Sequence, residues 1–258
     1  MAAEPAVGVR WTTAFLDLAP ADASAGVAFW RDVTQSSVSA RRGERGEFAT
    51  LVPPDGDAYV RVQDRAAGPA RGHLDLHVDD VPMAAEQAIA LGADARADHG
   101  GPIVVLASPG GFVFCLVSHH GEPHRPTPVG WPGGHRSLVD QVCLDVPAPA
   151  FAAEGLFWAA LTGWELRRGS RPEFSYLLRP VGLPLRMMLQ RLDESTPGQP
   201  VAAHLDLACD DVEAEVARHL VLGARVVRRT EVWVTLADPT GRQYCVTRRD
   251  PDTGSLSH

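Results

Sequence analysis

The chain has 258 residues, of which 45% are hydrophobic and 22% charged, as expected for a soluble globular protein with one large or two small domains. Its net charge of −8 disfavours nucleic acid or an anionic membrane as a partner, and no apolar run approaches the roughly 20 residues of a membrane span. The first residues lack the apolar core of a signal peptide, so we expect a cytoplasmic protein with four reduced cysteines.

The N-terminal part of the chain predicts a strand, a helix and then further strands. Segment 12–23 alternates like a strand and ends in an acidic turn. Asp22 or Ser24 can cap a helix that runs through Trp30. Short β-type runs separated by turn residues follow this helix. Together they predict one βαβββ module.

The same order returns directly afterwards. Segment 72–83 is a second strand and turn, with Asp80 as the N-cap and Pro82 in the first turn of a helix that ends at Gly92. Apolar strand-like runs follow again. We therefore predict two modules in the first half of the chain.

The second half repeats the first. Four landmarks recur in the same order, 128 to 131 residues later: Phe29-Trp30 as Phe157-Trp158, His73 as His204, the LGA at 91–93 as that at 222–224, and Cys115 as Cys245. Such a repeat is the signature of a duplicated structural unit.

These landmarks give the expected domain limits. We predict one domain over residues 8–118 and a second over 138–249. Residues 119–137 are rich in Pro, Gly and His and are predicted to be a linker, and 250–258 to be a flexible tail.

One strand pattern carries polar side chains in both halves: HLDLHVDD at 73–80 and HLDLACDD at 204–211. Alternate residues of a strand face opposite sides. His73, Asp75 and His77 therefore share one face, and the leucines between them share the other. We expect the following helix to cover the apolar face.

The repeated motifs, including FLDLAPADASAGVAFW, HLDLHVDD and SPGGFVFCLV, resemble those of the vicinal oxygen chelate superfamily. This superfamily includes glyoxalase I, bleomycin-resistance proteins and extradiol dioxygenases. The resemblance covers almost the whole chain and implies an α+β fold of two tandem domains. In each, paired βαβββ modules form curled mixed sheets around an open cup.

The resemblance also implies where metal ligands would lie. It points to Phe15, His73 and Cys115 in the first domain and to Gln141, His204 and Cys245 in the second, with Phe15 matched to Gln141. Phe15 cannot bind a metal, and cysteine replaces the carboxylate ligand of the family in both domains. We therefore expect no metal cofactor, and assign any divalent ion to the second domain.

The remaining expectation is a cup lined with His and Asp. A histidine oriented by an aspartate can move a proton, so the candidate catalytic residues are His73, Asp75, His204 and Asp206. The alternative for each of them is a structural hydrogen bond. The candidate ligand-binding residues on the polar faces and cup walls are Trp11, Phe15, Gln63, His77, Gln141, Gln190 and Trp233.

Three functions stay open from the sequence. The first is a metal-independent isomerase, cyclase or lyase acting on a small aromatic or polycyclic molecule, because such cups suit planar ligands. The second is a non-catalytic protein that sequesters a drug. The third is a metal-dependent lyase, epimerase or dioxygenase. In each case the partner is a small organic ligand and the protein is a monomer or homodimer.

Overall fold

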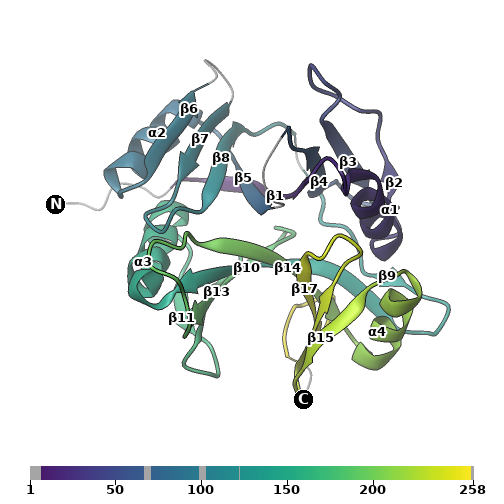
Figure 1. The fold of residues 1–258 in the computed structure, drawn as a ribbon. Coiled ribbons are helices and arrows are strands. Elements are labelled where there is room, and N and C mark those ends of the chain that lie inside the picture. The colour runs from purple at the N-terminus through teal and green to yellow at the C-terminus, as the bar shows by residue number, and fades with distance from the viewer. Residues whose placement is uncertain (1–6, 67–70, 99–102, 122, 257–258) are drawn as a thin grey trace. The chain divides into compact units, whose positions relative to one another are not determined.

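The computed structural model describes residues 7–66, 71–98, 103–121 and 123–256 (Figure 1). Among these residues, none of the helices has both the length and the apolar character needed to cross a membrane. Residues 257 and 258 of the predicted flexible tail lie outside the described residues. Residues 250–256 contain a turn and a β-bridge between Arg249 and Leu256.

The βαβββ pattern occurs four times, as predicted. The first module contains β1 (Val9–Leu18), α1 (Ala23–Val33), β2 (Ser37–Val38), β3 (Phe48–Val52) and β4 (Val60–Asp64). The second contains β5 (Arg71–Val78), α2 (Val81–Ala90), β6 (Asp94–Asp98), β7 (Ile103–Ala107) and β8 (Val113–Ser118). The third contains β10 (Arg136–Pro147), the 3₁₀ turn η1 (Ala148–Ala150), α3 (Phe151–Thr162), β11 (Leu166–Arg168), β12 (Phe174–Leu177) and β13 (Arg186–Leu192). The fourth contains β14 (Ala202–Cys209), α4 (Val212–Val221), β15 (Arg225–Arg229), β16 (Trp233–Ala237) and β17 (Gln243–Arg248).

Local sequence signals account for the helix starts. Asp80 is the N-cap of α2 and accepts a hydrogen bond from the Met83 amide, as predicted. Asp211 does the same for the Ala214 amide at α4. Asp22 is the N-cap of α1, but its side chain makes no capping hydrogen bond.

The strands form two open mixed sheets with the same plan. Their orders are β2-β3-β4-β1-β5-β8-β7-β6 and β11-β12-β13-β10-β14-β17-β16-β15. The short strand β9 (Val129–Gly130) pairs with β10. In both sheets the His-x-Asp strand runs parallel to the last strand of its module, so Asp75 aligns with Cys115 and Asp206 with Cys245. The α+β fold of two tandem domains is therefore confirmed.

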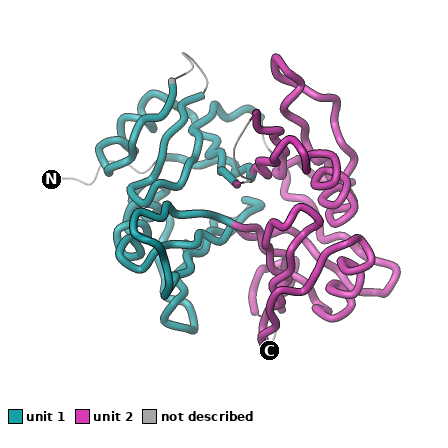
Figure 2. Tube along the Cα trace, viewed as in Figure 1, with its two compact units in different colours: residues 1–14, 72–123, 142–203 teal, residues 15–71, 124–141, 204–258 magenta. Residues whose placement is uncertain are grey.

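The chain divides into two compact units that each combine both halves of the sequence (Figure 2). Unit 1 consists of residues 1–14, 72–123 and 142–203. Unit 2 consists of residues 15–71, 124–141 and 204–258. Neither follows the predicted 8–118 and 138–249 limits, which describe the repeat in the sequence.

Within each unit, a helix of one half packs against a strand of the other. In unit 1, Trp158 of α3 packs edge-on against Phe114 of β8, with ring centroids 5.0 Å apart. In unit 2, Trp30 of α1 lies 5.1 Å from the ring of Tyr244 on β17. Both tryptophans are fully buried. The repeated Phe-Trp pair is therefore the core of each unit.

Residues 124–127 of the predicted linker are held by contacts within unit 2. The Asp57 carboxylate accepts from the His124 amide, and Asp55 accepts from the amide and hydroxyl of Thr127. Arg125 donates to backbone carbonyls near the C-terminus, at Pro251 and Asp252. These contacts fix the segment that leads into β10.

Candidate functional site

The two His-x-Asp strands have the predicted alternation. On β5, Leu74 and Leu76 are buried, and His73 and Asp75 lie on the other face. On β14, Leu205 and Leu207 play the same part opposite His204 and Asp206. The roles of the four polar residues follow from what each side chain contacts.

In unit 2, four side chains form a polar cluster, which we call the His204 cluster: Gln141, His204, Asp206 and Cys245. The Oδ1 atom of Asp206 lies 3.3 Å from His204 Nε2, within ion-pair distance, but it accepts no hydrogen bond from the described residues. Its other oxygen, Oδ2, accepts a short hydrogen bond from the Gln141 amide nitrogen. Cys245 Sγ is 3.8 Å from the same nitrogen of His204. The sequence predicted these residues, and the structure brings them together.

Burial sets the chemistry of this cluster. Asp206 and Gln141 are almost completely buried, whereas 14% of the His204 side chain is exposed. Burial, and next to it the Asp206 carboxylate, raise the pKa of the Cys245 thiol. Cys245 therefore stays a neutral thiol at physiological pH, and His204 is the group of the cluster that a small molecule can reach.

Arg249 and Asp140 extend the cluster inward, and sequence reasoning missed both. Arg249 makes a two-pronged ion pair with Asp140, at 2.7 and 3.0 Å. It also donates to the Gln141 side-chain oxygen at 3.0 Å. The signal that could have found Asp140 is its position directly before Gln141 in a mostly apolar strand, where a charged residue needs a partner.

The three ligands that the family resemblance implied for the second domain, Gln141, His204 and Cys245, do not fit a metal. Hydrogen bonds engage both ends of the Gln141 amide, and the Arg249 cation beside it opposes a second cation. The raised pKa of Cys245 also disfavours the thiolate that a metal needs. The structure therefore argues against Gln141, His204 and Cys245 as the ligands of a divalent ion.

Unit 1 contains a different arrangement around the first His-x-Asp pair. One ligand atom from each of His73, Asp75 and Cys115 lies within 4.8 Å of the other two. His73 Nε2 and Asp75 Oδ1 are 3.8 Å apart, too far for a hydrogen bond but compatible with two ligands of one ion. Nitrogen, oxygen and sulfur donors together suit zinc.

This group changes the expectation about metals. The first half was expected to be metal-free because Phe15 cannot be a ligand. Asp75, assigned only to orient His73, supplies the carboxylate that was missing from that count. The first half, which was expected to be metal-free, therefore has residues that fit a metal ion.

The matching of Phe15 with Gln141 was wrong by two residues. Counting back 15 residues from the equivalent buried Trp30 and Trp158 gives Phe15 and Cys143. Gln141 corresponds instead to Thr13. A shift of two leaves a side chain on the same strand face, so the alternation did not reveal the error.

The other predicted residues of the first half take structural contacts. The Thr13 hydroxyl lies 2.9 Å from His77 Nε2, and Trp11 is buried. Phe15 packs edge-on against Phe48, with centroids 6.4 Å apart. Gln63 lies opposite Phe48 on the neighbouring strand and is half-buried.

Those of the second half lie on half-buried sheet surface. Gln190 pairs across the strands with Phe174, and Trp233 lies under the Arg228 guanidinium at 5.7 Å. Phe174 and Tyr176 are half-buried on one face of β12 and were not predicted. Their alternation in FSYL was the signal that could have found them.

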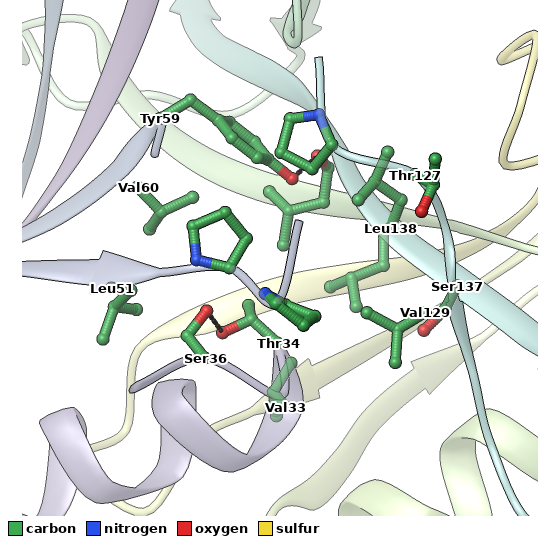
Figure 3. A pocket seen from close by; sticks show the side chains of 15 residues that line it. Val33, Thr34, Ser36, Leu51, Tyr59, Val60, Thr127, Val129, Ser137 and Leu138 are labelled. Carbon is green, nitrogen blue, oxygen red and sulfur yellow. Dashed lines mark hydrogen bonds between the residues drawn. The ribbon is translucent and has the colours of Figure 1, made fainter. Parts of the chain in front are cut away.

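A pocket in unit 2 lies apart from the His204 cluster (Figure 3). Val33, Tyr59 and Val139 are among the side chains that line it, and the Tyr59 hydroxyl donates to the Val139 carbonyl at 2.6 Å. Leu207 also lines it, from the face of β14 opposite to His204. None of the four residues of the His204 cluster lines this pocket.

Comparison with known proteins assigns the fold to a family. A family model described as a glyoxalase-like domain matches residues 13–117 and again residues 141–247. The chain belongs to this glyoxalase-like family. The two matches confirm the duplication, and the family resemblance drawn from the sequence is correct. No curated protein matches the chain at a significant level.

Solved structures of the vicinal oxygen chelate superfamily share the fold. The Mn(II)-bound glyoxalase from Novosphingobium aromaticivorans is 16% identical with a TM-score of 0.64, covering 98% of this chain and 86% of that one. The 2,2',3-trihydroxybiphenyl 1,2-dioxygenase from Sphingomonas wittichii is 18% identical with a TM-score of 0.62, covering 94% and 89%. At these identities the glyoxalase-like chain shares their fold, and its chemistry follows from its own residues.

Proposed function

We propose that this glyoxalase-like protein is an enzyme that moves a proton on a small organic molecule, with His204 as the acid–base group. Asp206 orients the imidazole, and no metal takes part at this centre. The observation that carries the proposal is the buried Asp206 carboxylate, fixed by Gln141 and 3.3 Å from the partly exposed His204. A histidine beside a buried carboxylate suits proton abstraction near neutral pH.

The reaction class is an isomerisation, cyclisation or elimination. In an isomerisation or cyclisation a proton leaves one atom of the substrate and returns to another, and in an elimination it can be passed to the departing group; one histidine can serve as base and then as acid in each. We propose an aromatic or polycyclic substrate, supported by the half-buried Trp233 on a strand of the same module. The protein would act in the cytoplasm as a monomer or homodimer.

The test compares three variants with the wild type. A library of polycyclic natural products is first screened for a rise in melting temperature, and the ligands found are then assayed for conversion by mass spectrometry. His204→Gln and Asp206→Asn should keep ligand binding and lower turnover by about 10²–10⁴-fold. His124→Gln, which changes an exposed histidine, is the control and should turn over normally.

Two results would contradict this proposal. Turnover that survives in His204→Gln would remove His204 from the chemistry. Tight binding of a compound that the wild type never converts would favour the sequestering function instead.

A second candidate function rests on the His73, Asp75 and Cys115 group. A zinc ion bound there would supply a Lewis acid that polarises a substrate oxygen or lowers the pKa of a bound water. Metal analysis of protein purified without chelator or metal-affinity resin tests it. About one zinc per chain, lost in Asp75→Asn and retained in Asp94→Asn, which changes an exposed carboxylate, would support it, and background metal would refute it.

A further inference from the structure

The His204 cluster is the outer end of a continuous chain of buried polar contacts. Arg249 binds Asp140 through both terminal nitrogens and the Gln141 oxygen through one of them. Its Nε donates to the Thr247 hydroxyl at 2.8 Å. Gln141 then donates to Asp206. These contacts use four of the five N–H groups of the Arg249 guanidinium.

The chain fixes the orientation of the Gln141 amide. A guanidinium only donates hydrogen bonds, so the group beside Arg249 must be the amide oxygen. A carboxylate only accepts, so the group beside Asp206 must be the amide nitrogen. With Arg249 in place, Gln141 has one orientation, and that orientation holds the Asp206 carboxylate.

Stability is a poor explanation for this arrangement. Asp140 is fully buried and Arg249 is 4% exposed. Removing two such charges from water costs about as much as their attraction returns, and apolar replacements of buried ion pairs are often neutral or stabilising. A buried pair next to a candidate reaction centre is better explained by the geometry that it imposes.

The first half of the chain provides an internal comparison. The residues equivalent to Asp140, Gln141 and Arg249 are Thr12, Thr13 and His119. Thr13 contacts His77, and the His119 ring contacts the Gly121 carbonyl. The same fold is thus built in the first half with uncharged Thr12 and Thr13 at the two strand positions, so the fold does not require the ion pair.

We propose that Arg249 and Asp140 are positioning residues that act through Gln141 to hold the Asp206 carboxylate against His204. This inference rests on the proposed function, because it assigns a purpose to the geometry of the same centre. Neither residue touches the substrate. The effect of Arg249 reaches the imidazole through the side chains of Gln141 and Asp206, and the effect of Asp140 passes first through Arg249.

The experiment uses the full chain labelled with ¹⁵N at histidine and needs no ligand. An imidazole N–H whose nitrogen lies 3.3 Å from a buried carboxylate is shielded from solvent, exchanges slowly and gives a downfield proton signal. We expect this signal for His204 Nε2 in the wild type, assigned by its absence in His204→Gln. It should be lost in Arg249→Met, because Gln141 can then rotate away from Asp206.

Two further variants keep the test decisive. Gln141→Leu leaves the Asp140–Arg249 pair in place and should lose the same signal, which tests the contact through which the pair acts even if Arg249→Met does not fold. Trp30→Phe removes a hydrogen bond to Asp238 elsewhere in unit 2 and should keep the signal, which excludes general loosening.

The outcomes separate this inference from the proposed function. The signal surviving in both Arg249→Met and Gln141→Leu, or missing from the folded wild type, would overturn the positioning role. Loss of the signal in both variants while His204→Gln retains turnover would leave the positioning intact and refute the proposed function. Loss of turnover in His204→Gln with an unchanged signal in Arg249→Met would do the reverse.

Discussion

Glu215 on α4 offers a large stability effect for a single substitution. Its carboxylate is fully buried. It accepts hydrogen bonds from His135 at 2.8 Å, Ser137 at 2.6 Å and two nitrogens of Arg218 at 2.7 and 2.8 Å. His219 Nε2 lies 3.1 Å away. These donors come from the start of β10, the residue before it and α4 itself, so one carboxylate joins the linker to the helix.

Glu215→Gln keeps the shape of the side chain but removes its charge and replaces one acceptor oxygen with a donor. Breaking a buried ion pair by removing one partner costs about 3–5 kcal/mol. For a chain of this size that free energy corresponds to a fall in melting temperature of about 6–20 °C. Equilibrium unfolding in urea, followed by circular dichroism, and calorimetry measure the two quantities.

Glu213→Gln is the matched control. Glu213 lies two residues earlier on the same helix and pairs with Arg229, but 73% of its side chain is exposed. Exposed pairs contribute about 0–1 kcal/mol. If Glu215→Gln unfolds within about 1 kcal/mol of wild type, as the control should, the buried carboxylate is not the stabilising group inferred from its contacts.

The effect should also depend on pH. Burial by itself raises the pKa of Glu215, but hydrogen bonds from Arg218 and His219 outweigh it and hold the pKa below its usual range. A group with a lowered folded-state pKa stabilises fully above its unfolded pKa of about 4.3 and loses this contribution as the pH falls below it. The difference between wild type and Glu215→Gln should therefore shrink between about pH 5 and about pH 3.

Three further predictions concern the packing inside each unit and the reactivity of one thiol. Trp30→Phe and Trp158→Phe each lose an indole N–H bond to a carboxylate at 2.9 Å, to Asp238 and Glu154 respectively, so each should cost about 1.5–3 kcal/mol in urea unfolding; unequal costs would contradict the equivalence of the two helices. Gly110→Ala should cost about 1–3 kcal/mol because the new Cβ would lie 2.5 Å from Val201 and 2.8 Å from Glu154, whereas Gly130→Ala, with nothing within 4 Å, should change stability by less than about 0.5 kcal/mol. Cys245 should react with iodoacetamide at pH 8 at least about 10-fold more slowly than it does in urea, because burial raises its pKa; equal rates, measured by mass spectrometry of the labelled peptide, would show an accessible thiolate.

The fold could be predicted from the sequence because its signals are local or periodic. The alternation around His73 and His204 fixes the face of each strand. Asp80 and Gly92 mark the ends of one helix within their own neighbourhood. The recurrence of Phe29-Trp30 at Phe157-Trp158 then predicts the same elements in the second half of the chain.

The contacts within the site could be predicted only in part. His204 and Asp206 are two residues apart on one strand, so their proximity is a property of the strand. Arg249 and Asp140 are 109 residues apart, and no local pattern links them. A charged residue in a chain with 24 basic and 32 acidic residues has too many candidate partners for the sequence to select one.

The division of the chain into units has a consequence for synthesis on the ribosome. Unit 2 joins residues 15–71 to residues 204–258, and Trp30 finds its carboxylate partner 208 positions later. The apolar face of α1 must therefore wait, without its final neighbours, until nearly the whole protein has been translated. Segments 72–123 and 142–203 of unit 1 complete earlier. Contacts of such long sequence separation form slowly, so nascent α1 stays exposed to chaperones and to premature aggregation until they form.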